Sequence, residues 1–145
     1  MATFTQAQGA RSPSLLNLGS LASGAYITSS AIDLGPSMPL DVTLEVECDP
    51  NGTPTGNRQL MLFAKLSLDN VNFGSGPESG TTATEEADLH WIGTLPCNDT
   101  NTHRKMFSLS SLPIARYLKL VVKNDMGVAL TSGEVYKADI TGVSA

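Results

Sequence analysis

The feature that most constrains the fold is a strict alternation of apolar and polar residues from Pro39 to Asp49, in the segment PLDVTLEVECD. Leucine, valine and cysteine occupy every second position, and aspartate, threonine and glutamate lie between them. Successive side chains of a β-strand point to opposite faces, so this pattern predicts one buried face and one acidic, solvated face. This part of the chain is therefore expected to lie in a sheet that covers a core on one side.

Other segments have a similar character, and no long segment has the 3.6-residue period of an amphipathic helix. The further expected strands are a strand or strand pair in 24–35, then 58–69, 88–96, 105–113, 116–124, 127–130 and 134–141. We expect segments 39–49 and 58–69 to pair as an antiparallel hairpin. Short strands separated by Gly, Pro and Asn predict an all-β fold, a β-sandwich or jelly roll of about eight antiparallel strands.

The length of 145 residues fits one domain. We expect an extended N-terminal arm over residues 1–24 and a β-sandwich domain over residues 25–145. The predicted core is the set of apolar residues with period 2: Leu40, Val42, Leu44, Val46, Leu60, Leu62, Leu66, Leu118, Leu120, Val122 and Ile140.

The arm has too few apolar residues to fold alone, but it has enough to anchor on a neighbouring subunit; the alternative is a frayed terminus. In segment 58–69, Met61 and Phe63 lie on the otherwise polar face, where apolar groups suggest contact with a partner or with the arm. The predicted partner-binding residues are Phe4, Leu15, Leu16, Leu18, Met61 and Phe63.

The net charge of −5 and the scattered basic residues argue against a nucleic-acid partner, which needs clustered Lys and Arg. No segment approaches the length of apolar chain that spans a membrane, so no membrane partner is expected. Residues 1–20 lack an apolar run behind a basic start, which predicts synthesis in a cytoplasm. In that compartment Cys48 and Cys97 are expected to be free thiols.

No catalytic set is expected, because the two histidines, His90 and His103, lie in no recognisable catalytic motif. Zinc binding by these histidines with Cys48 and Cys97 is disfavoured, since no two of the four have a ligand spacing such as CxxC. We therefore predict a protein that is not an enzyme and has no cofactor and no metal.

Segments 69–72 and 77–88 are both rich in polar groups. Asp69, Asn70 and Asn72 are interpreted as turn residues that hydrogen-bond their own backbone. The second segment has four carboxylates, and we favour a solvated loop over a calcium site because the EF-hand spacing is absent. These four carboxylates belong to Glu78, Glu85, Glu86 and Asp88.

Four segments together resemble a group of small virion proteins of tailed phages, the jelly-roll cement or decoration proteins of capsids. The segments are AYITSSAIDLG, LFAKLSLDNVNFGSGPESGTT, HWIGTLP and RYLKLVVKNDMG. The shared pattern is a strand, the sequence Ser-x-Asp-x-x-Asn-Phe, a glycine-rich loop and a late strand before a turn. It covers residues 25–142 and includes no catalytic motif.

The resemblance implies a non-enzymatic structural protein on the capsid surface of a virion, made in the host cytoplasm. It further implies two partners: the major capsid protein, whose neighbouring subunits it would bridge, and a second copy of itself in a dimer or trimer. The alternative is a carbohydrate-binding jelly-roll module on a phage tail or fibre. The scarcity of aromatic residues, which stack on sugar rings, favours the structural role.

Overall fold

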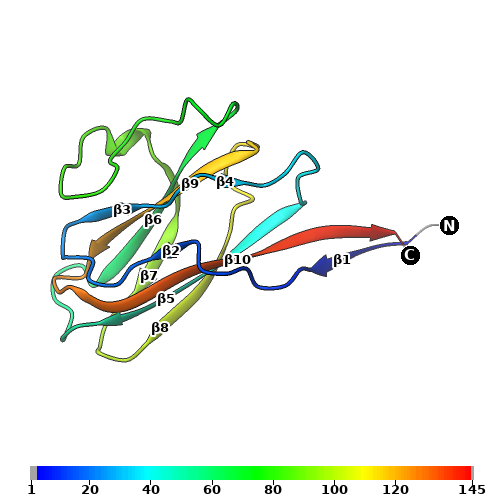
Figure 1. Ribbon diagram of the computed structural model, residues 1–145. Helices are drawn as coiled ribbons and strands as arrows, with labels where there is room; N and C mark the ends of the chain where they lie inside the picture. Colours follow the sequence, from blue (N-terminus) through cyan, green and yellow to red (C-terminus); the bar gives the residue numbers. More distant parts are fainter. Residues whose placement is uncertain (1–2, 145) are drawn as a thin grey trace.

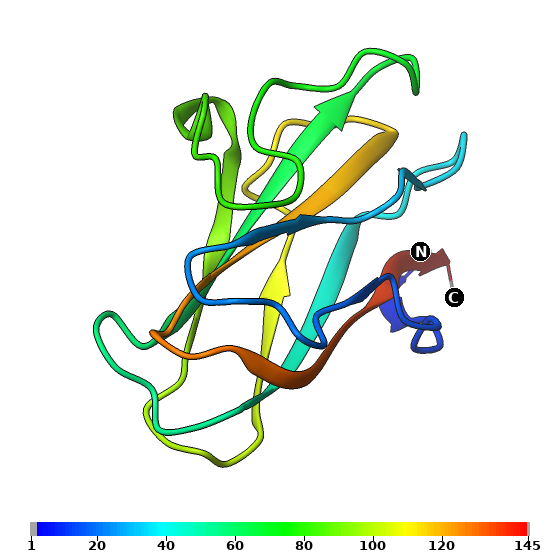
Figure 2. The ribbon, with the colours of Figure 1, turned by 60° about the vertical axis from the view of Figure 1, so that its left-hand side comes forward.

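The computed structural model describes residues 3–144 and shows two antiparallel sheets packed together as a β-sandwich (Figures 1 and 2). Sheet A contains β1 (Phe4–Gln8), β2 (Leu16–Asn17), β5 (Asp41–Pro50), β8 (His103–Ser108) and β10 (Leu130–Ser144). Sheet B contains β3 (Tyr26–Thr28), β4 (Ile32–Asp33), β6 (Gln59–Ser67), β7 (His90–Pro96) and β9 (Tyr117–Asp125). The predicted sandwich is confirmed, with ten strands in place of about eight.

Sheet A has the order β1-β10-β5-β8, with β2 also on β10, and sheet B has the order β3-β9-β6-β7, with β4 also on β9. The expected hairpin between segments 39–49 and 58–69 is therefore wrong. β5 pairs with β10 and β8, whereas β6 pairs with β7 and β9. The loop 51–58 crosses from one sheet to the other, so the apolar faces of β5 and β6 meet across the core instead of lying side by side.

The core between the sheets contains most of the predicted residues. Val42, Leu44 and Val46 of β5 are buried. The predicted core residues of β6 and β9 that are also buried are Leu60, Leu62, Leu118, Leu120 and Val122. Leu66 is partly buried against the core, and Ile140 is only half-buried. The prediction for Leu40 is wrong: it is 66% exposed, because it precedes β5 at the rim of the sandwich.

Residues 12–21 lie alongside β10 and pack on the core. Backbone N–H groups of Ser12, Leu15 and Leu18 donate to carbonyl oxygens of β10 at 2.7–2.8 Å, and β2 is the short paired part of this segment. Gly133 makes the close approach possible, since a Cβ there would lie 2.9 Å from the Cβ of Leu18. The N-terminal segment thus covers part of its own sandwich.

Beyond this body, β1 pairs only with the last residues of β10, of which Ile140 also pairs with Asp41 of β5. Their register runs from Phe4 opposite Ser144 to Gln8 opposite Ile140. We call β1 together with residues 140–144 the terminal ribbon. It extends away from the packed sheets, with the start of β1 and the end of β10 at its tip (Figure 1).

The outer face of sheet B is covered in part by the loop 74–89, which includes the 3-10 helix Glu86–Asp88. A second, smaller core lies under this loop and consists of Tyr26, Phe63, Leu89 and Val121. This cover explains why the middle of β6 is buried on both faces.

Candidate functional site

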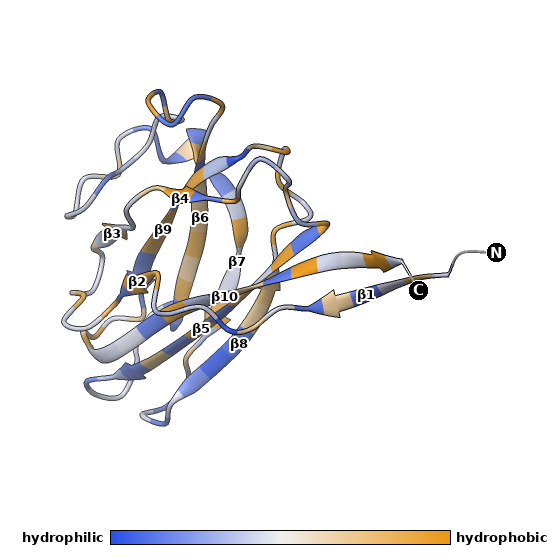
Figure 3. Cartoon of the chain, turned by 45° about the vertical axis from the view of Figure 1, so that its right-hand side comes forward, coloured by the Kyte–Doolittle hydropathy of each residue, from blue (hydrophilic) through white to orange (hydrophobic). Residues whose placement is uncertain are grey.

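The terminal ribbon is the most exposed regular structure in the described part of the chain. Every residue of β1 is exposed, and so are the last four residues of β10. Phe4 is 76% exposed, and the end of β10 has a strongly hydrophobic segment at the tip of the ribbon (Figure 3). An exposed apolar side chain on an extended element is typical of a contact surface.

The ribbon also lacks the features that usually protect a free strand edge. Residues 3–10 and 140–144 include no charged residue and no proline, and the pairing has no bulge. Natural edge strands are commonly blunted by Lys, Pro or a bulge, because an open row of N–H and C=O groups pairs readily with another strand.

The hydrogen bonds show which backbone groups of β1 face outward. The N–H of Gly9 donates to the carbonyl oxygen of Asp139 at 2.8 Å, so these opposite residues form a hydrogen-bonded pair. In an antiparallel ladder such pairs alternate with pairs whose N–H and C=O groups point away. Phe4, Gln6 and Gln8 therefore direct their backbone groups to the free edge of β1.

An apolar groove of about 420 Å³ opens at the end of the sandwich next to the base of the ribbon. Its apolar lining includes Leu34, Met38, Leu40, Leu66, Leu112 and Ile114. Leu40 links the two features, since a Cβ on Gly142 of the ribbon would lie 3.3 Å from a Cδ atom of Leu40. The apolar groove thus adjoins the uncharged ribbon at Leu40.

The predicted partner-binding residues of the N-terminal segment occupy different environments. Phe4 is exposed on the ribbon, whereas Leu16 and Leu18 are buried in the core of their own chain, Leu18 completely. Leu15 packs against the same core and is partly buried. In the single chain only Phe4 of these four offers its whole side chain to a partner.

The other two predicted residues, Met61 and Phe63, lie beneath elements of their own chain. Phe63 is 5% exposed and meets the ring of Trp91 edge-on, with 5.3 Å between ring centroids. Met61 is partly buried against the same cluster. Their position on the outer face of sheet B was predicted correctly, but the loop 74–89 covers them, a cover that strand patterns cannot reveal.

The loop 74–89 is held on sheet B by the buried ammonium group of Lys65. The side chain of Lys65 is 2% exposed, and its Nζ donates to a carboxylate oxygen of Glu78 at 2.8 Å and to the carbonyl oxygen of Gly76 at 3.0 Å. Lys123 forms a second ion pair with Glu86 at 3.5 Å. These carboxylates hold the loop on the sheet individually instead of converging on a shared centre.

The turn interpretation of residues 69–72 is confirmed. A carboxylate oxygen of Asp69 accepts hydrogen bonds from the backbone N–H groups of Asn72 at 2.8 Å and Val71 at 2.9 Å. These bonds, with those from the side chains of Asn72 and Ser67, hold the pKa of the Asp69 carboxyl well below its usual range. The carboxylate is engaged in shaping the chain.

The two cysteines meet across the core as unbonded thiols, with 3.5 Å between Cys48 Sγ and Cys97 Sγ. Hydrogen bonding with Cys97 and burial raise the pKa of the Cys48 thiol, whereas the same hydrogen bond lowers the pKa of Cys97. Their proximity was not predictable, because it results from the crossing of the chain between the sheets.

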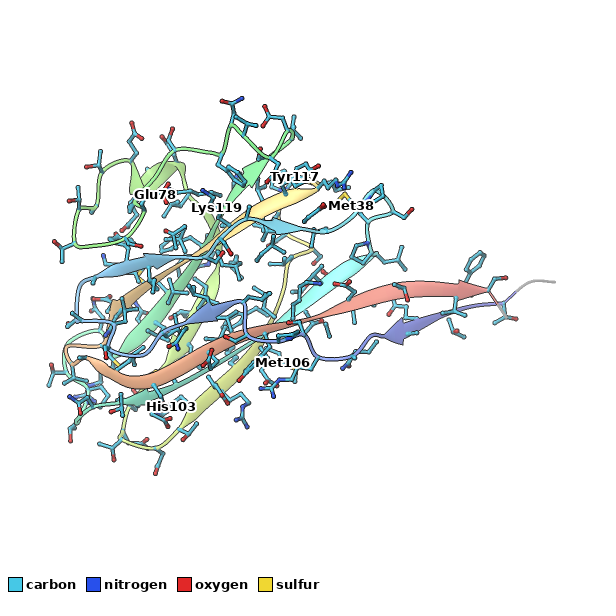
Figure 4. All side chains as sticks on the ribbon, in the orientation of Figure 1. Met38, Glu78, His103, Met106, Tyr117 and Lys119 are labelled. Atoms are coloured by element: carbon cyan, nitrogen blue, oxygen red, sulfur yellow. The ribbon has the colours of Figure 1, made fainter. Side chains whose placement is uncertain are left out.

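His103 lies opposite Cys48 in the pairing of β8 with β5, and its ring contacts Asp99. The Nε2 atom of His103 lies 3.0 Å from a carboxylate oxygen of Asp99. His103 and Met106 project from β8 at the side of the molecule opposite Glu78 (Figure 4). Within residues 3–144 no group of three His, Cys, Asp or Glu side chains is arranged to hold a metal ion.

The chain matches no protein-family model and no curated protein. In the described residues no helix has the length and apolar character needed to cross a membrane.

Proposed function

We propose that the protein is a non-enzymatic structural component of a phage virion, a cement protein on the capsid surface that joins neighbouring major capsid subunits. The proposal starts from the resemblance of residues 25–142 to jelly-roll decoration proteins, and the sandwich architecture is compatible with it. The resemblance concerns the scaffold, whereas the contact surface depends on the residues of this chain.

The terminal ribbon is the observation that carries the proposal. It places an uncharged pair of strands, with the exposed side chain of Phe4, away from a body whose chain has a net charge of −5. Separating an uncharged contact element from an acidic body allows association with limited charge repulsion. A free strand edge and an adjoining apolar groove are suited to binding a protein chain.

A role in a shell also fits the small size of this surface. Each copy offers one ribbon and the groove beside it, which is modest for a stable pairwise complex. In a shell the contacts are repeated over many copies, and linked binding events raise the overall avidity without stronger individual contacts.

The test is localisation and add-back on particles of a phage that encodes this chain. Particles that lack the protein should lose heat resistance and regain it with the purified full chain. A variant without residues 1–9 should bind the shell at least about tenfold more weakly, a loss equivalent to about 1.4 kcal/mol. Met106→Ala, which truncates an exposed side chain on β8, is the matched control and should bind normally.

Two results would overturn the proposal. One is the absence of the protein from purified particles. The other is its location on a tail or fibre, together with binding of a purified host glycan, which would support the carbohydrate-binding alternative.

A further inference from the structure

We infer that the free edge of β1 is a self-association site, at which two copies of this chain pair antiparallel about a twofold axis at Gln6. The inference deepens the proposed function by assigning the surface through which the protein binds itself. Its basis, however, is the geometry of one strand edge, which can be tested with the purified protein alone.

The outward-facing backbone groups of β1 are spaced symmetrically. Phe4, Gln6 and Gln8 are the residues whose N–H and C=O groups do not bond to β10, as the hydrogen bond from Gly9 to Asp139 establishes. The opposite edge agrees, because the carbonyl oxygen of Ile140 accepts from the N–H of Leu40 on the side away from β1.

An antiparallel copy of this edge fits it without any change of register. With Gln6 opposite Gln6 of the second copy, Phe4 lies opposite Gln8 of that copy, and Gln8 lies opposite its Phe4. Each opposed pair then brings together N–H and C=O groups that are free in the single chain. A twofold contact needs this self-complementarity, in which one patch binds its own duplicate.

A second copy of this chain is the partner best suited to the free edge of β1. The edge has no charged residue, so two copies of β1 can meet without like charges in contact, although the whole chains repel each other through a net charge of −5 each. Because the ribbon extends from the body (Figure 1), two bodies can stay apart while their ribbons pair. Exposure of every β1 residue leaves the edge accessible.

Pairing would also give the ribbon the neighbours that it lacks. A ribbon of two strands is only marginally stable in water, whereas added strands stabilise a sheet. The dimer would have a continuous sheet of order β10-β1-β1-β10 across two chains. The ribbon is therefore a partial sheet that a second copy completes.

The test compares Gln6→Pro with Gln6→Thr by sedimentation velocity over a range of concentrations. Proline removes the outward N–H at the centre of the contact but no bond to β10, and proline is tolerated at a strand edge whose N–H faces solvent. Threonine removes the same glutamine side chain and retains the N–H. We expect a concentration-dependent dimer for the original chain and Gln6→Thr, and a dissociation constant at least about tenfold higher for Gln6→Pro.

A second variant keeps the test decisive if proline disturbs the ribbon itself. Gln6→Lys places the positive charges of the two copies directly opposite each other across the axis and should weaken the dimer. Thr5→Lys also adds one charge per copy, but on the other face and not directly opposite each other, and should weaken the dimer less. A chain that stays monomeric at all concentrations, or a dimer unaffected by Gln6→Pro and Gln6→Lys, overturns the inference.

The result is separable from the capsid-binding proposal. A monomer that still attaches to particles would overturn self-pairing and leave the proposed function in place. If Gln6→Pro also abolished that attachment, the free edge would instead bind a strand of the shell protein. A dimer that forms as expected but binds no particles would retain the inference and remove the cement role.

Discussion

Strand β10 passes through two environments, and the difference separates the body of the molecule from its terminal ribbon. Over residues 130–139 it has β5 on one edge and the N-terminal segment on the other, and Val135 is completely buried. Over residues 141–144 its only strand partner among the described residues is β1, and these four residues are exposed. One continuous strand is thus a core element in its first part and a surface for contact in its last.

The comparison indicates that regular backbone pairing and stability are different properties. The body buries a core shared by both sheets, so its free energy of folding comes largely from apolar burial. The ribbon has the same ladder of hydrogen bonds but no core, and such bonds contribute little net stability when water competes for them. We therefore expect body substitutions to change stability and ribbon substitutions to change association.

The largest effect is expected for Leu44→Ala, at the centre of the core. Leu44 is almost fully buried on β5, and the substitution leaves a cavity that should lower the free energy of unfolding by about 2–5 kcal/mol. Val143→Ala, the ribbon counterpart, should change it by less than about 0.5 kcal/mol. Urea unfolding of both variants measures the contrast, and equal losses would contradict it.

A slightly smaller loss is expected for Asn124→Ala, which acts on a polar group in the body. The fully buried side-chain amide of Asn124 donates to the carbonyl oxygens of Leu21 and Val128 at 2.9 and 2.8 Å, and its oxygen accepts from the N–H of Met126 at 3.0 Å. Removing it leaves these groups without this partner, at a cost of about 2–4 kcal/mol. Thermal unfolding checks this value. An unchanged melting temperature would mean that the turn after β9 is held by its backbone alone.

The covering loop 74–89 should respond less, because its ion pair is partly solvated. Glu78→Gln removes the charge that faces the buried ammonium of Lys65 and should cost about 1 kcal/mol. It should also speed proteolytic cleavage within the loop. Glu85→Gln, at an exposed carboxylate of the same loop, is the matched control. Equal cleavage rates in the two variants would mean that the ion pair of Lys65 with Glu78 does not hold the loop on sheet B.

The same contrast explains what could be predicted from the sequence. Period-2 alternation identified the buried face of β5, including Val42 and Leu44, because one face of that strand meets the core and the other meets solvent. It could not show which strands pair, since a loop such as 51–58 can either turn back or cross to the second sheet. Nor could it show that Leu18 packs on Gly133, a contact between distant parts of the chain.

The contact surface was only partly predictable for the same reason. Phe4 was predicted to bind a partner and its side chain is exposed, but the buried position of Phe63 depends on the loop 74–89 that covers it. The free edge of β1 became evident only from its pairing with β10, because the direction of each backbone group follows from register.

A small effect on stability is also expected from removing residues 1–9. The described side chains of this stretch are all exposed, so the truncated chain should unfold within about 1 kcal/mol of the full chain in urea. Self-association should be lost in the same variant. A loss of several kcal/mol would show that the ribbon belongs energetically to the body.

The most direct test of the contrast is residue-resolved amide hydrogen exchange, measured by NMR in dilute and concentrated protein. Amides of β5 should be strongly protected at both concentrations, because they open only with the body. The outward amides of Phe4, Gln6 and Gln8 should exchange rapidly in dilute protein and become protected as its concentration rises. If these three amides exchange at the same rate at both concentrations, the ribbon does not pair with a second copy, and the account of it as a contact element between copies is contradicted.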